Sequence, residues 1–187
     1  SDGWYKNYLE YCMLNKLGVT GGSYERQIKE KGNFYKKILI LLKRQRNQGK
    51  PRLLDIGCAG EAFVDMAQDE GFEAMGCDCE SIEVINTLKN KKLNLLVGSL
   101  EELGLEKESF GIVTMLDVLE HMKDPLEMLK HIHGLLIPGG ILLIVVPNFS
   151  LYHLQYKLGL KKINIQHLIV WTHIFFFTRY TMTKFLT

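Results

Sequence analysis

From residue 52 onward, short apolar runs alternate with segments in which apolar residues recur at helical spacing. The helical segments comprise residues 62–70, residues 81–89 and a stretch that begins at Asp124, each with one apolar face. Strands and helices that alternate in this way require right-handed crossovers and a parallel sheet covered on both faces. The pattern therefore predicts an α/β fold with a doubly wound, mostly parallel sheet. Its expected strands are 52–56, 72–77, 93–97, 112–116 and 141–146.

Local signals predict where the later elements begin and end. Asp124 precedes Pro125 and has Glu127 three positions after it, which is typical of a capped helix start. Gly134 is expected to close that helix, and the turn at 138–140 (Pro-Gly-Gly) is expected to lead into the last strand.

The first 50 residues are expected to be helical. A helix is predicted at 23–46, after the glycine pair at 21–22, and Tyr5, Tyr8 and Tyr11 can line an earlier helix face. The organisation inferred for this single domain is an N-terminal helical cap (1–50), an α/β core (51–150) and a lid segment that ends in a late helix (151–187).

Composition and charge narrow the class of protein. The 187 residues, 47% hydrophobic and 24% charged, fit one globular domain and exclude a disordered chain. Residues 51–150 carry a net charge of −10, which argues against nucleic-acid binding by the core. The flanks carry +7 (1–50) and +5 (151–187). These basic ends are either solvated helix faces or a surface for an anionic partner such as a membrane.

The remaining sequence signals concern compartment and metal binding. The most apolar run, 167–177, is about half the length of a membrane-spanning helix, and no secretory signal is recognisable, so a cytoplasmic protein is expected. The four cysteines (12, 58, 77 and 79) lack the spacing of a zinc or redox motif, and no metal site is predicted. Nothing in the sequence indicates an oligomeric state.

The loops after the strands are where a sheet of this kind binds ligands. Residues 57–60 (Gly-Cys-Ala-Gly) form a small-residue turn after the first strand, and Asp78 lies 21 positions after Gly57 at the end of the second. A carboxylate there can accept hydrogen bonds from a ribose, which indicates a nucleoside-containing cofactor. A nicotinamide dinucleotide is one alternative, since Gly57, Ala59 and Ala62 form a degraded glycine motif. Glu61 argues against it, because an anion would lie beside the pyrophosphate.

Five motifs in order make residues 52–148 resemble a class I S-adenosylmethionine-dependent methyltransferase of the quinone-biosynthesis, small-molecule subgroup. They are LLDIGCAG (53–60), GCDCES (76–81), GSLEEL (98–103), SFGIVTMLDVLEHMKDP (109–125) and LLIPGGILLIVVPN (135–148). The aromatic stretch WTHIFFFT (171–178) resembles the segment before that subgroup's late helix. The implied function is methyl transfer from S-adenosylmethionine to a small-molecule acceptor by in-line displacement.

The resemblance also implies a set of site residues. Glu120, His121 and His173 are the candidates for taking a proton from an acceptor hydroxyl, although His121 can instead order its loop through a backbone hydrogen bond. The residues implied to bind the cofactor are Asp55, Gly57, Cys58, Ala59, Asp78, Cys79, Ser99, Leu100, Leu116 and Asp117.

The chain departs from the family pattern at several positions. Ala59 and Glu61 replace glycines and Ser99 replaces an aspartate, so cofactor binding is expected to be micromolar or weaker. Two final strands of the family are absent from the sequence, which leaves a sheet edge to be covered by other means. The alternative function is a catalytically weak or inactive binding or regulatory module. Trp4, Tyr5, Tyr8, Trp171 and 175–177 either enclose a flat acceptor or form a plain hydrophobic lid.

Overall fold

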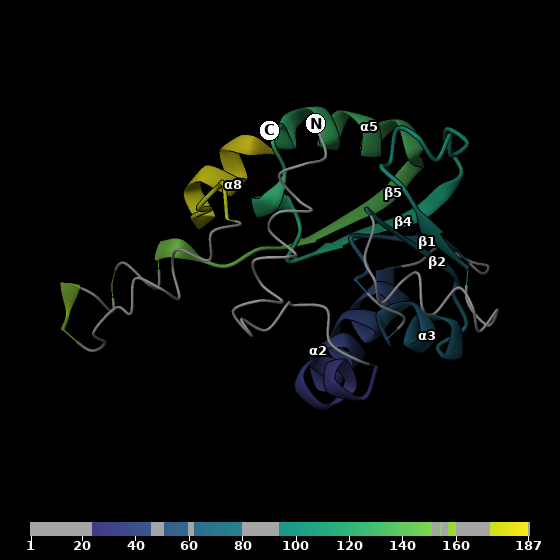
Figure 1. Cartoon of the computed structure of the whole chain (residues 1–187), viewed down its shortest axis with the longest axis horizontal. Helices are drawn as coiled ribbons and strands as arrows, with labels where there is room; N and C mark the ends of the chain where they lie inside the picture. Colours follow the sequence, from purple (N-terminus) through teal and green to yellow (C-terminus); the bar gives the residue numbers. More distant parts are fainter. Residues whose placement is uncertain are drawn as a thin grey trace, which may run out of the picture.

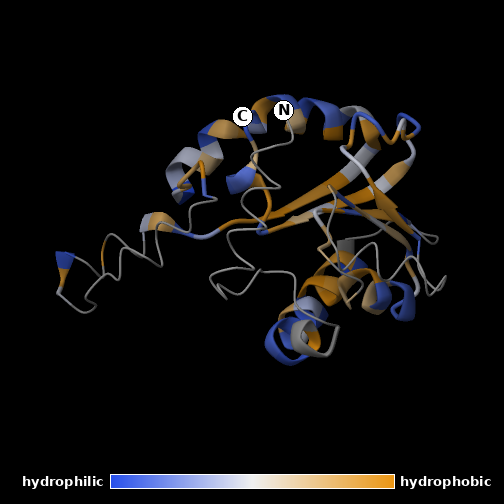
Figure 2. Cartoon of the chain, viewed as in Figure 1, coloured by the Kyte–Doolittle hydropathy of each residue, from blue (hydrophilic) through white to orange (hydrophobic). Residues whose placement is uncertain are grey.

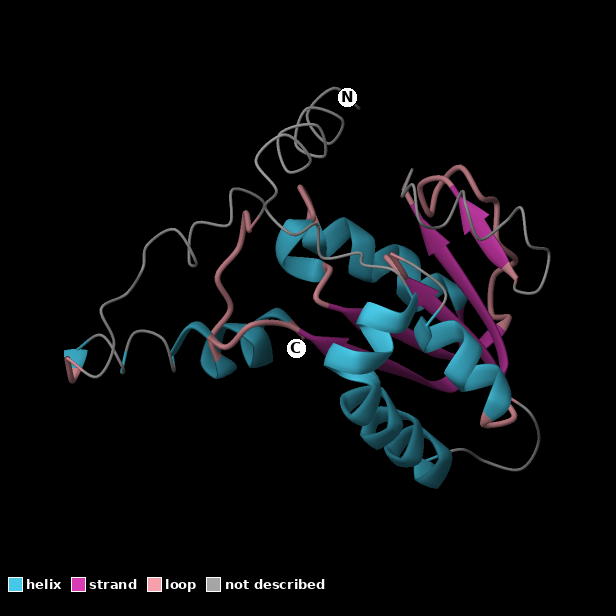
Figure 3. Ribbon diagram, turned by 60° about the horizontal axis from the view of Figure 1, so that its bottom comes forward, coloured by secondary structure: helices cyan, strands magenta, loops and turns pink. Residues whose placement is uncertain are grey.

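A five-stranded parallel sheet in the order β3-β2-β1-β4-β5 forms the centre of the molecule (Figures 1 and 3). A computed structural model describes residues 24–45, 51–59, 62–79, 94–150, 154, 157–159 and 173–186, with backbone alone at 24–27 and 45. The strands are β1 (Arg52–Ile56), β2 (Glu73–Asp78), β3 (Leu95–Val97), β4 (Phe110–Leu116) and β5 (Leu136–Val145). The predicted doubly wound α/β fold is therefore confirmed.

The helices described lie on both faces of this sheet (Figure 1). They are α2 (Tyr24–Gln45), α3 (Ala62–Asp69), the 3-10 turn η1 (Leu119–His121), α5 (Pro125–Leu135) and α8 (Arg179–Phe185). α2 and α3 cover one face, and α5 and α8 lie on the other. None of the described helices has both the length and the apolar character needed to cross a membrane.

Two hydrophobic cores form because side chains alternate between the faces of each strand. Leu53 packs with Leu39 and Phe63 beneath α2 and α3, whereas Leu54, the next residue, packs with Ile132 beneath α5. Figure 2 shows the resulting contrast between the hydrophobic strands and the mixed surfaces of the helices. The sheet is thus buried on both faces, as its apolar sequence predicts.

The expected helix start at Asp124 is confirmed, since its carboxylate accepts a hydrogen bond from the backbone N–H of Glu127 at 2.9 Å. The expected Pro-Gly-Gly turn before the last strand is wrong in its position. β5 already begins at Leu136, which pairs with Phe110, and the next pair is Ile112 with Ile141. Residues 137–140 therefore form a bulge within the strand, where Gly139 adopts a φ of +77°.

Some sequence-based expectations concern residues outside the described part of the chain. These are the helices around Tyr5–Tyr11 and 81–89, the residues Gly60 and Glu61, and the aromatic residues Trp4 and Trp171. The division into cap, core and lid stays a prediction. In the described part, β5 pairs with β4 alone and forms one edge of the sheet.

Candidate functional site

The order of the strands places a ligand site at the carboxyl ends of β1 and β4. β1 pairs with β2 on one side and with β4 on the other, so the loops that follow β1 and β4 diverge. Ligands of doubly wound sheets bind at such a switch point. Gly57 and Asp117 directly follow these two strands, and Asp78 ends the neighbouring β2.

The turn after β1 needs glycine for two reasons. Gly57 has a φ of +70°, and a Cβ atom built there would lie 2.5 Å from Cγ2 of Val118. Its backbone N–H donates to the carbonyl oxygen of Cys77 at 2.8 Å, which ties the turn to β2. Ala59 also has a positive φ, +50°, so the alanine that replaces the family's glycine holds a backbone conformation that disfavours a Cβ atom.

Asp78 faces the turn after β1. Its Oδ2 atom accepts a hydrogen bond from the backbone N–H of Ala59 at 2.8 Å, and the residue is 8% exposed. A buried carboxylate therefore lies beside a left-handed turn at the switch point. Cys79, the next residue, is exposed, with its Sγ atom 3.6 Å from the carbonyl oxygen of Gly98.

Asp55 is buried within the sheet beneath α2, where it accepts a hydrogen bond from Oγ1 of Thr114 at 2.6 Å. Burial raises the pKa of this carboxyl group to about 7, and the hydrogen bond from Thr114 only partly opposes that rise. Cys58 is also buried, in the core beneath α2 and α3. The side chains of both predicted cofactor residues thus serve packing and internal hydrogen bonding.

The loop after β3 uses its polar groups internally. Ser99 directs its backbone N–H and its hydroxyl to Oε2 of Glu102, at 2.9 and 2.8 Å. The side chain of Leu100 is buried in the core beneath α5. The adenine-side role expected of Ser99 and Leu100 therefore falls to their backbone or requires the hydroxyl of Ser99 to change partners.

Asp117, after β4, pairs with a residue that the sequence did not single out. Its Oδ2 atom lies 2.8 Å from Nζ of Lys31 on α2, and both side chains are over a third exposed. Its backbone has a φ of +58° and donates its N–H to the carbonyl of Val145 at 2.9 Å. Leu116, at the end of β4, is half-buried. Lys31 carried no motif signal, because lysines on an amphipathic helix normally face solvent.

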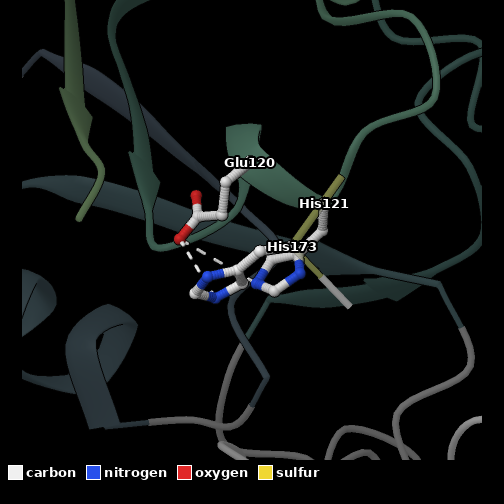
Figure 4. A group of neighbouring side chains, drawn as sticks. All are labelled: Glu120, His121 and His173. Atoms are coloured by element: carbon white, nitrogen blue, oxygen red, sulfur yellow. Dashed lines mark ion pairs between the residues drawn. The ribbon is translucent and has the colours of Figure 1, made fainter. Parts of the chain in front are cut away.

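Glu120, His121 and His173 come together beyond β4, as Figure 4 shows. The Nε2 atoms of His121 and His173 lie 3.9 and 4.0 Å from Oε1 of Glu120. The two imidazole rings are 4.8 Å apart and inclined by 63°. The backbone N–H groups of Ile174 and Phe175 donate to the carbonyl of Glu120 at 2.8 and 3.1 Å, which holds the segment with His173 against η1.

This cluster is electrostatically unusual. Glu120 is 1% exposed, and neither of its carboxylate oxygens has a hydrogen-bond partner. Burial raises the pKa of Glu120 to about 7, and the neighbouring charge of Asp117 adds to the rise. Burial and the nearby His121 lower the pKa of His173. The sequence suggested these residues singly, whereas the structure brings them into one group of possible metal ligands.

Comparisons with known proteins agree with this architecture. A family model described as a methyltransferase domain matches residues 24–187. The chain is 31% identical to the ubiquinone biosynthesis O-methyltransferase of Coxiella burnetii over 108 residues, which are 54% of this chain and 46% of that protein. It is 34% identical to the protein of the same name from Ruegeria pomeroyi over 95 residues, 48% and 38% of the two chains. It therefore spans less than half the length of these curated relatives.

A solved structure shares the fold. The S-adenosylmethionine-dependent methyltransferase from Archaeoglobus fulgidus superposes with a TM-score of 0.61 and 22% sequence identity, over 87% of this chain and 71% of that one. At this level of identity the similarity concerns the fold alone.

Proposed function

This chain belongs to the methyltransferase-domain family, and on that premise we propose that it transfers a methyl group from S-adenosylmethionine to an oxygen atom of a small-molecule acceptor. The observation that carries the proposal is the buried Asp78 carboxylate beside the turn at Gly57 and Ala59. The oxygen acceptor is supported by the relatives, which are named as O-methyltransferases.

The residues at the switch point fit the cofactor. A carboxylate at the end of the second strand matches the hydroxyl pair of a ribose, and a turn without bulky side chains lets an amino-acid tail approach the backbone. In the proposed site Asp78 holds the ribose, and the backbone at Gly57 and Ala59 faces the methionine part. The other proposed cofactor residues act mainly through backbone or pocket shape: Asp55, Cys58, Cys79, Ser99, Leu100, Leu116 and Asp117.

The chemical demand on the protein is modest. S-adenosylmethionine supplies a methyl group that is already activated, and its carbon–sulfur bond breaks as the acceptor oxygen bonds to the methyl carbon. The chain then has to align the acceptor and receive its hydroxyl proton. Glu120, His121 and His173 are the polar groups proposed for the acceptor side. Phe176, 6.4 Å from the His173 ring and 5.1 Å from Phe149, gives that side an aromatic surface.

Calorimetric titration with S-adenosylhomocysteine tests the cofactor site. We expect the wild type to bind with a micromolar or weaker Kd. The Asp78→Asn variant should bind at least tenfold more weakly, because a hydrogen bond to a charged group contributes about 1.5–3 kcal/mol. Asp69→Asn, an exposed aspartate at the end of α3, is the matched control and should bind like the wild type. No heat at near-millimolar ligand would refute the proposal.

A second measurement separates the enzyme from a binding module. The protein is incubated with S-adenosylmethionine and a panel of small phenols and catechols, and S-adenosylhomocysteine is quantified by mass spectrometry. Acceptor-dependent turnover that falls in the Asp78→Asn variant is expected. Binding without turnover across the panel would favour the catalytically inactive module. Excess NADH should not displace the ligand, since the nicotinamide alternative requires that it compete.

A further inference from the structure

Glu120, His121 and His173 each offer one ligand atom, and these three atoms all lie within 4.8 Å of one another. We propose that they bind a divalent transition-metal ion, with zinc as the best match, and that the ion keeps open positions for the acceptor oxygen. The metal site stands on the geometry of the three side chains. Its role toward the acceptor rests on the proposed function.

The donor set is one that catalytic metal ions use. Two imidazoles and one carboxylate bind zinc in enzymes that leave the remaining positions to water or substrate. With bond lengths of about 2.0–2.2 Å, tetrahedral ligand atoms lie about 3.4 Å apart. The oxygen of Glu120 and the two imidazole nitrogens, at 3.9 and 4.0 Å, need to close by only about half an ångström.

The buried carboxylate is an independent indication of a cation. Glu120 is 1% exposed, and both of its oxygens are without a hydrogen-bond partner. A buried carboxylate without compensation is strongly unfavourable, and a bound cation is one of the few partners that removes the penalty. In Figure 4 one of its oxygens points toward the two imidazoles, so a cation placed between these groups would satisfy it.

The protonation state also suits metal binding. A metal ligand must be a neutral imidazole or an ionised carboxylate. Burial lowers the pKa of His173, which keeps that ring neutral with a lone pair to donate. The neighbouring Asp117 adds negative charge that favours a cation at this point.

The backbone positions the ligands before any metal binds. Glu120 and His121 are consecutive in η1, and the carbonyl of Glu120 accepts hydrogen bonds from Ile174 and Phe175, directly after His173. The third ligand is therefore pinned to the first by main-chain contacts that do not depend on the ion. Such preorganisation lowers the cost of assembling the site.

The ion would act on the acceptor hydroxyl. A metal-bound hydroxyl loses its proton more readily, and the proton passes to water. The oxygen lone pair then bonds to the methyl carbon while the carbon–sulfur bond breaks and the sulfur keeps the electron pair. The products are the methylated acceptor, S-adenosylhomocysteine and one proton.

Metal titration tests the site without reference to activity. The full chain is dialysed against chelator, and Zn²⁺ binding is measured by equilibrium dialysis with elemental analysis. Co²⁺ serves as an optical probe of the ligand set. One Zn²⁺ per chain and a protein-dependent Co²⁺ spectrum are expected. Either a wild type that binds no Zn²⁺ or a Co²⁺ spectrum unchanged by protein would overturn the proposal.

Variants assign the ligands. Glu120→Gln and His173→Gln should each weaken Zn²⁺ binding more than tenfold. The matched controls are Glu101→Gln and His131→Gln, because these residues form an exposed carboxylate–imidazole pair at 3.6 Å and should leave binding unchanged. Equal effects in both sets would overturn the proposal. Since the wild-type titration decides independently, a variant that fails to fold does not protect the proposal.

The two proposals fail separately. Titration with S-adenosylhomocysteine reports the cofactor site, and zinc titration reports the metal site. Zinc binding that depends on Glu120 in a protein that ignores S-adenosylhomocysteine would refute the proposed function and support the metal site. The reverse result would overturn the metal site and leave the three side chains as a metal-free acceptor group.

Discussion

Replacing Asp55 with asparagine tests the consequence of burying a carboxyl group in the middle of the sheet. Asp55 is 2% exposed on β1, and its neighbour Thr114 on β4 donates its only described side-chain hydrogen bond. The substitution keeps the size of the side chain and removes its ionisation. We therefore expect it to change how stability depends on pH more than it changes stability at any one pH.

The sign and size of the effect follow from the pKa. Burial raises the pKa of Asp55 from 3.8 to about 7. Between these values the native protein holds a proton that the unfolded chain releases, so the free energy of unfolding falls as the pH rises. At about 1.4 kcal/mol per pKa unit, the full loss is on the order of 4 kcal/mol. About 3 kcal/mol of it falls between about pH 5 and pH 8, and the loss levels off above the folded pKa.

Urea unfolding followed by circular dichroism, at several pH values across this interval, measures the effect. The wild type should lose stability toward alkaline pH more steeply than Asp55→Asn, by up to about 3 kcal/mol over the interval. The exposed-residue control Asp69→Asn should keep the wild-type slope. Thr114→Val should cost more at alkaline than at acid pH, because it removes a donor from the ionised carboxylate. Equal slopes for wild type and Asp55→Asn would refute the reasoning.

Two further predictions concern backbone geometry. Gly57→Ala should destabilise the protein by about 2 kcal/mol or more, since it combines a positive φ with a Cβ contact 2.5 Å from Val118; urea unfolding in a Val118→Ala background should recover the steric part alone, and full additivity of the two changes would contradict that explanation. Asp124→Ala should cost about 1 kcal/mol by removing the cap of α5, whereas Asp124→Asn should cost much less; equal losses in the two variants would show that the cap hydrogen bond is not the cause.

The elements that could be predicted are those whose limits are set by neighbouring residues. β1 has the predicted bounds because Pro51 and Gly57 flank its apolar run. The start of α5 was predictable because Asp124 and Pro125 act within one turn. The position of the bulge at 137–140 was not, since it depends on the register between β4 and β5 rather than on the glycines themselves.

The cofactor side could be predicted further than the acceptor side. Asp78 and the turn at Gly57 follow adjacent strands, and parallel strands bring their carboxyl ends to the same edge. The convergence of His173 on Glu120 depends instead on hydrogen bonds from Ile174 and Phe175 to a carbonyl group. Backbone contacts between distant segments leave no side-chain pattern in the sequence.

The turn at Asp117 connects the two halves of the proposed site. Its left-handed backbone, at φ +58°, ends β4 abruptly, and its N–H remains tied to Val145 on β5. The chain then enters η1 within two residues, which places Glu120 close to the end of the strand. A non-glycine residue holds this conformation only where its surroundings compensate for the strain, and the ion pair with Lys31 is one such compensation. If the proposals hold, the same short turn sets the distance between the methyl donor and the acceptor, because Leu116 and Asp117 face the donor while Glu120 and His121 hold the acceptor.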